Sequence, residues 1–106
     1  MNLTHVKPPL DPAVLRPFDR SETLSAKEAT AWSGKTVSTI KRWCHRFAIG
    51  RRVGGRWLIS KPALLALLEG DGDLLARYWA GDRESAAIAE LFERAGAPLP
   101  RIRRAA

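Results

Sequence analysis

The sequence has little of the chemistry that disulfides, metal sites and catalytic centres need. Its 106 residues include one cysteine and two histidines. A single thiol, Cys44, cannot form an internal disulfide, which fits a reducing cytoplasm. One cysteine and two distant histidines do not supply the ligands of a zinc site. No Ser/His/Asp set, paired carboxylates or phosphate-binding glycine loop stands out. We therefore expect no enzyme activity, no metal and no cofactor.

Long apolar runs are also missing. The longest, such as residues 63–68, are far shorter than the roughly 20 residues of a membrane-spanning helix. Residues 1–9 hold two prolines, a lysine and a histidine but no apolar signal-peptide core. We therefore expect a cytoplasmic protein without a membrane partner. The length suits one small domain, which at this size buries roughly 60–65% of its unfolded surface.

Acidic residues are absent from one long central stretch. The net charge is +7, from 18 Lys and Arg against 11 Asp and Glu. Residues 35–61 hold eight Lys and Arg and no Asp or Glu, whereas residues 62–100 hold three basic and seven acidic residues. Arg101, Arg103 and Arg104 form a second, smaller basic region. This distribution favours a polyanionic partner over a merely solvated charged face.

The first predicted helix follows a proline-rich segment. Four prolines within residues 1–22 predict an extended arm that is mobile or lies across the domain. Ser25 and Glu28 then form a capping-box pattern, and Gly34 is placed to end the helix. Ala29 and Trp32 are expected to face inward.

A second helix is expected from an N-cap at Thr36 to an end at Gly50. Ile40, Trp43, Cys44 and Phe47 recur at the spacing of one apolar helix face. The opposite face is polar and basic and carries Ser38, Lys41, Arg42, His45 and Arg46.

A hairpin and more helices are predicted next. Residues 51–53 and 56–59 flank Gly54-Gly55, a two-residue turn that hairpins favour. A third helix over residues 63–69 is capped by Ser60, and two more are expected over residues 73–80 and 82–95. Trp32, Trp43 and Trp57 are assigned to the core.

Together these segments resemble the winged helix-turn-helix DNA-binding domains of phage excisionases and related MerR-like regulators. The resemblance lies between residues 24 and 68. It rests on Lys27-Glu28-Ala29, Gly34, Ser38-Thr39-Ile40, Arg42-Trp43 and Val53-Gly54-Gly55-Arg56-Trp57. Lys35 stands where such proteins usually carry an apolar residue, and Val37 is expected to supply that contact. The chain lacks the coiled-coil heptads of MerR regulators, so excisionases are the nearer group.

The resemblance implies a mainly α fold with a small β-hairpin. Residues 1–22 would be the arm, 23–69 the winged helix-turn-helix, 70–97 additional C-terminal helices and 98–106 a basic tail. It also places Ser38, Lys41 and Arg42 in or near the major groove, Arg56 on the wing and Trp57 as the anchor of the wing. The full candidate DNA-binding set is Thr36, Ser38, Thr39, Lys41, Arg42, His45, Arg46, Arg51, Arg52, Gly54, Gly55 and Arg56.

The implied function is that of an excisionase, or recombination directionality factor. Such proteins bind double-stranded DNA, bend it and help a site-specific recombinase (an integrase) to excise an integrated mobile element. Two alternatives stay open: a small transcriptional regulator with the same DNA contacts, and a phage packaging or recombinase-interaction subunit. The apolar residues of the C-terminal helices, among them Leu91 and Phe92, either cover the open side of the core or pack on a second copy or a recombinase.

Overall fold

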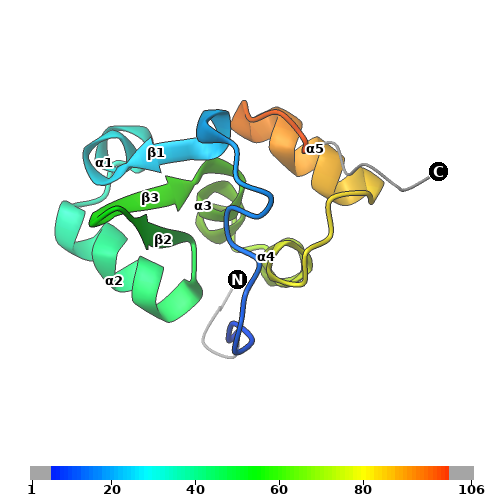
Figure 1. Cartoon of the computed structure of the whole chain (residues 1–106), viewed down its shortest axis with the longest axis horizontal. Helices are drawn as coiled ribbons and strands as arrows, with labels where there is room; N and C mark the ends of the chain where they lie inside the picture. The colour runs from blue at the N-terminus through cyan, green and yellow to red at the C-terminus, as the bar shows by residue number, and fades with distance from the viewer. Residues whose placement is uncertain (1–5, 101–106) are drawn as a thin grey trace.

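Residues 6–100 are described in a computed structural model (Figure 1). Arg101, Arg103 and Arg104 lie outside this range. Within it are five α-helices and a small three-stranded antiparallel sheet, which confirms the expectation of a mainly α fold with a small β component. The elements are η1 (Arg20–Glu22), β1 (Thr23–Ser25), α1 (Ala26–Ser33), α2 (Val37–Phe47), β2 (Gly50–Val53), β3 (Arg56–Ser60), α3 (Lys61–Leu68), α4 (Gly72–Trp79) and α5 (Ala86–Ala95).

The start of each of the first two helices follows its sequence signal. The Ser25 backbone N–H donates to Glu28 Oε1 (2.9 Å) and the Glu28 N–H donates to Ser25 Oγ (3.1 Å), so the capping box at α1 is confirmed. Gly34 ends α1 in the left-handed region, with φ 75°. Thr36 caps α2 by accepting from the Thr39 N–H (3.1 Å). Only residues 34–36 separate the two helices, which fixes their packing against each other.

The predicted end of α2 is wrong. The helix stops at Phe47 because Ala48, rather than a glycine, adopts the left-handed conformation with φ 45°. Gly50 instead begins β2. A Cβ at this position would lie 2.5 Å from the Leu58 carbonyl oxygen, so glycine is needed where β2 approaches β3.

The sheet has one strand more than the predicted hairpin. Its order is β1-β3-β2, and β1 pairs with β3 through Leu24 and Ile59. β2 pairs with β3 through Arg51 and Leu58, and through Arg52 and Trp57. β1 is three residues long with one buried apolar side chain. A strand this short shows no alternation of apolar and polar residues in the sequence. It forms because the edge of β3 is open to pair with it.

The C-terminal helices complete the core. Leu75, Tyr78 and Trp79 of α4 and Ile88, Leu91 and Phe92 of α5 are all buried. Leu91 and Phe92 expose no surface, so they cover the core and are unavailable to a second copy or a recombinase. The last helix begins at Ala86 rather than at Asp82. Ser85 caps it, while the Asp82 carboxylate accepts the N–H groups of Glu84 and Ser85 (both 3.0 Å).

The tryptophans do not share one role. Trp32 is 40% exposed, which corrects its assignment to the core. Ala29 is the one fully buried residue of the short α1, and Trp32 lies on a side of the helix that meets solvent. Trp43 and Trp57 are half-buried and pack against the core. Trp79 is 3% exposed, and its Nε1–H donates to the carbonyl oxygens of Phe47 (3.1 Å) and Ala48 (3.2 Å), which ties α4 to the end of α2.

The segment before η1 is part of the body. Residues 13–18, called the strap here, run between the sheet and α4 (Figure 1). Val14 and Leu15 are buried in the core. The Ala13 N–H donates to the Trp79 carbonyl (2.8 Å) and the Leu15 N–H donates to the Tyr78 hydroxyl oxygen (2.8 Å). The strap is therefore held by α4 through both backbone and side-chain bonds.

A buried carboxylate lies where these parts meet. Glu22 has no exposed surface, and its Oε2 accepts from the hydroxyls of Ser60 (2.7 Å) and Tyr78. Arg83 is 2% exposed, lies 4.1 Å from the centre of the Tyr78 ring, and donates to the Ala13 carbonyl (2.6 Å) and the Tyr78 carbonyl (2.9 Å). Desolvation raises the pKa of Glu22, although the two hydroxyl bonds and the charge of Arg83 oppose that shift.

This burial predicts a pH-dependent stability. Because the pKa of Glu22 is higher in the folded state, its contribution is fully present below the ordinary pKa and is lost as pH rises through the raised value. The free energy of unfolding of the native protein, minus that of Glu22→Gln, should therefore fall as pH rises from about 4 to about 8. Urea titrations at several pH values measure this difference. A difference that stays constant or rises would contradict it.

Candidate nucleic-acid interface

The outer face of α2 is polar, basic and open. Ser38, Lys41, Arg42, His45 and Arg46 are all exposed, as the spacing predicts. On the opposite side of the helix, Ile40, Cys44 and Phe47 are buried and fix its orientation. The apolar side of the helix is therefore packed in the core, and its charged side chains point outward.

The two threonines at the start of α2 have a different role. Thr36 is exposed and Thr39 is half-buried. Their hydroxyls hydrogen-bond each other (3.0 Å), and Thr36 Oγ1 also caps the helix. Both side chains are engaged in the helix start, so they contribute to the surface mainly by holding its first turn.

The turn before α2 differs from its predicted packing. Val37 is 42% exposed, so it does not supply the apolar contact expected of it. Lys35 instead places its Nζ 5.9 Å from the centre of the Trp43 ring. A cation at this distance from an aromatic face is weakly attracted to it. Lys35 therefore covers an aromatic ring while its charge adds to the basic surface.

The β2–β3 hairpin, called the wing here after its predicted role, divides its arginines between two faces. Side chains alternate along a strand, and directly paired residues share a face. Arg52 pairs with Trp57 and lies on the face turned to α2. Arg51 pairs with Leu58, and Arg56 pairs with Val53, on the opposite face. Alternation in the sequence already separates Arg51 from Arg52, although the predicted set grouped all three.

Trp57 joins the wing to α2. The ring of His45 meets the ring of Trp57 edge-on, with centroids 5.1 Å apart, and Arg52 lies 5.9 Å from the same indole. His45, Arg52 and the outer face of α2 therefore form one continuous basic surface, called the α2 surface here.

Arg51 is not part of that surface. It is half-buried, and its Nη2 donates to the Leu15 carbonyl (3.4 Å). Its guanidinium also lies 6.0 Å from the Phe18 ring. Arg51 thus connects the wing to the strap.

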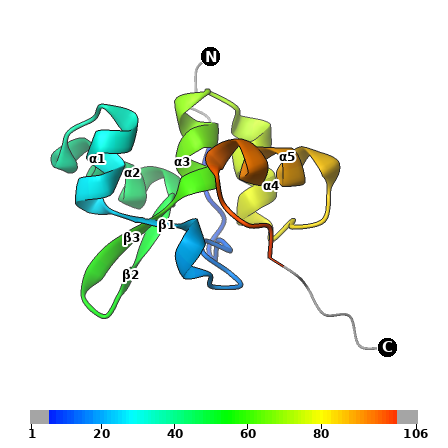
Figure 2. The same cartoon turned by 90° about the horizontal axis from the view of Figure 1, so that it is seen from above.

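The tip of the wing is exposed and built from glycine. Gly54 and Gly55 have φ values of 58° and 81°, and nothing lies within 4 Å of a Cβ built on either. The Arg52 Nη2 donates to the Gly55 carbonyl (3.3 Å), which holds this arginine near the tip. Figure 2 shows the β2–β3 hairpin extending beyond the helices. Backbone without side chains can approach another molecule closely.

The positive charge of this region is not neutralised within the described part of the chain. The ion pairs there are Arg16–Asp11, Arg77–Asp82, Arg94–Glu69 and Arg94–Glu90. All lie outside residues 35–61. The basic side chains of α2 and the wing therefore carry positive charge that no carboxylate in an ion pair there offsets.

Comparisons of the chain with protein-family models, curated proteins and solved structures found no match. Between residues 6 and 100, no group of three His, Cys, Asp or Glu side chains is arranged to hold a metal ion. No helix in the same range combines the length and apolar character needed to cross a membrane. The residues and geometry of the α2 surface are therefore the basis for inferring what it binds.

The orientation of α2 can be tested through its cysteine. Cys44 is 5% exposed, and burial raises the pKa of its thiol to about 12. The reactive thiolate is therefore scarce at neutral pH. Cys44 should resist a thiol-reactive dye in the folded protein and react fully in denaturant. Rapid labelling of the folded protein would mean that this side of α2 faces solvent.

Proposed function

We propose that this protein binds double-stranded DNA, with α2 as the recognition helix of a winged helix-turn-helix. The observation that carries the proposal is the outer face of α2, where Ser38, Lys41, Arg42 and His45 are exposed at helical spacing on a rigidly packed helix. Eleven residues give a helix about 16 Å long. Its diameter with side chains, about 10–12 Å, fits the major groove, which is about 12 Å wide. Arginine and lysine side chains can contact guanine edges and phosphates there.

The wing supports the same mode of binding. Trp57 places Arg52 next to His45 of α2, and the Gly54-Gly55 tip of the same hairpin extends beyond the helices, so one duplex could contact both α2 and the wing. With α2 in the major groove, the tip would approach the neighbouring backbone or minor groove, where arginine is favoured by the strong negative potential. Arg56 follows the tip but projects from the other face of the sheet.

Charge also favours one orientation of the duplex. The basic side chains of α2 and Arg52, which belong to the acid-free residues 35–61, face the DNA in this arrangement. The acid-rich residues 62–100 form α3, α4 and α5, and the last two lie at the other end of the molecule (Figure 1). Repulsion of phosphates by that end would disfavour binding there.

Among DNA-binding roles, we propose that of an excisionase. The support is the resemblance of residues 24–68 to that group, together with the α1-turn-α2-wing order. The protein would bend its site and assist a recombinase in excising an integrated element. Leu91 and Phe92 are buried in the core, so contact with a recombinase would use another surface.

Charge-neutral variants of α2 should weaken DNA binding. Lys41→Ala or Arg42→Ala is expected to lower affinity for a duplex about tenfold, because each removes a base or phosphate contact. The loss of a phosphate contact should also reduce the salt dependence of log K by about one. Fluorescence anisotropy at several salt concentrations measures both effects. Arg77→Ala on α4 removes the same charge from a distant, half-exposed side chain and is the matched control.

Equal effects of Arg42→Ala and Arg77→Ala would contradict the assignment of α2. Duplex binding that does not change with salt would contradict contact with the phosphates, and no binding to any duplex would contradict DNA binding itself.

The excisionase role has a separate test in the cell that carries the gene. Deleting the gene should reduce excision of the integrated element to background, and expressing the native protein or Arg77→Ala should restore it. Arg42→Ala should fail to restore it because the DNA contact is lost. Unchanged excision, with altered transcripts from a single operator, would instead identify a transcriptional regulator.

A further inference from the structure

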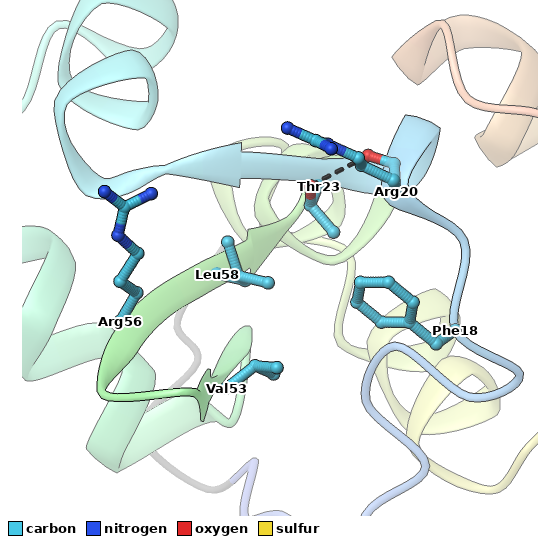
Figure 3. A pocket seen from close by; sticks show the side chains of 6 residues that line it. All are labelled: Phe18, Arg20, Thr23, Val53, Arg56 and Leu58. Atoms are coloured by element: carbon cyan, nitrogen blue, oxygen red, sulfur yellow. Dashed lines mark hydrogen bonds between the residues drawn. The ribbon is translucent and has the colours of Figure 1, made fainter.

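A second surface lies on the sheet face turned away from α2. It is a pocket of about 290 Å³ lined by Phe18, Arg20, Thr23, Val53, Arg56 and Leu58. Figure 3 shows Leu58 and Val53 between Arg56 on one side and Phe18 on the other, with Arg20 and Thr23 along the upper rim. The pocket therefore draws on the strap, η1 and all three strands.

The fold explains why these residues meet. Val53, Arg56 and Leu58 share a face because Val53 pairs with Arg56, and Leu58 lies two positions after Arg56 on the same strand. The strap holds Phe18 beside them. Its backbone is fixed at Leu15, where the carbonyl accepts from Arg51 and the N–H donates to the Tyr78 hydroxyl. Thr23 Oγ1 donates to the Arg20 carbonyl (2.8 Å), which fixes the rim. The pocket is thus built on restrained backbone.

The lining is apolar in its floor and wall. Phe18 is 49% exposed and Val53 is 38% exposed, with half-buried Leu58 between them. Apolar side chains that gather around an open pocket, with a polar rim, are typical of an interaction site. The bound group should therefore include a large apolar side chain.

The rim of the pocket is positively charged and suits a negatively charged group. Arg20 and Arg56 are exposed, and within residues 6–100 neither forms an ion pair with a carboxylate. Of the acidic residues next to Arg20, Asp19 accepts the Ser21 N–H and Glu22 is buried among hydroxyls. The guanidinium groups at the rim are therefore free to bind a carboxylate, for which their planar fork is well matched.

We propose that this pocket binds an acidic segment of a partner protein that carries a large apolar side chain. The carboxylates pair with Arg20 and Arg56, and the apolar side chain packs on Val53, Leu58 and Phe18. DNA is the weaker candidate because protein–DNA interfaces are polar and strongly charged, whereas half of this lining is apolar. Since the pocket and the α2 surface use opposite faces of the sheet, the protein can hold DNA and a partner together.

The test uses an end-capped acidic peptide with a central leucine–phenylalanine pair, titrated into the isotope-labelled full chain. NMR shifts should concentrate on the pocket-lining residues and leave the outer face of α2 unchanged. Arg20→Gln or Phe18→Ala should weaken peptide binding roughly three- to tenfold. Arg77→Gln is the charge-matched control and should not. Replacing the leucine–phenylalanine pair by two serines should remove the shifts at Val53 and Leu58.

Three outcomes would overturn the proposal. The first is the absence of shifts at the pocket. The second is shifts spread equally over the basic face of α2, which would indicate unspecific attraction of charge. The third is a loss of duplex affinity in Arg20→Gln and Phe18→Ala as large as that in Arg42→Ala, which would assign the pocket to DNA. Retained peptide binding with no duplex binding would leave this proposal standing and refute the DNA-binding proposal.

Discussion

The carboxylate of Glu22 is removed from water, and four parts of the chain meet around it. Ser60 joins it to the start of α3, Tyr78 joins it to α4, and the same Tyr78 hydroxyl holds the strap at Leu15. A buried carboxylate is tolerated only where hydrogen bonds and opposite charge compensate for lost hydration. Arg83 supplies that charge while bonding carbonyls of the strap and α4. The arrangement of sheet, strap and C-terminal helices therefore depends on this one cluster.

Local signals in the sequence were sufficient for most helices. The capping box at Ser25, the cap at Thr36 and the apolar spacing of α2 depend on neighbours along the chain, and the structure confirms each. The predictions from sequence fail where the structure of a segment depends on residues far away along the chain. Nothing near Thr23 indicates a strand until β3 lies beside it, and Trp32 is exposed because no element covers that side of α1. The Glu22 cluster joins residues more than 35 positions apart, so no local pattern could show it.

The candidate site was predictable as a set of residues but not as surfaces. The acid-free stretch identified the basic region, and helical spacing identified the exposed face of α2. The hairpin was treated as one basic unit, although strand alternation assigns Arg52 to one face and Arg51 and Arg56 to the other. Phe18 and Arg20 could not be linked to the wing from sequence, because the strap brings them there through Leu15. The α2 surface and the arginine-rimmed pocket therefore lie on opposite faces of the same sheet.

The strand order has a further consequence for how this protein behaves at high concentration. In the order β1-β3-β2, the four-residue β2 is an edge strand with backbone groups open to another chain. Such edges can template aggregation unless charge or brevity prevents it. Arg51 and Arg52 place one positive charge on each face of this edge, so two copies approaching edge to edge repel each other. Arg52 of the α2 surface and Arg51, which bonds the strap, thereby also oppose the association of two copies through this edge.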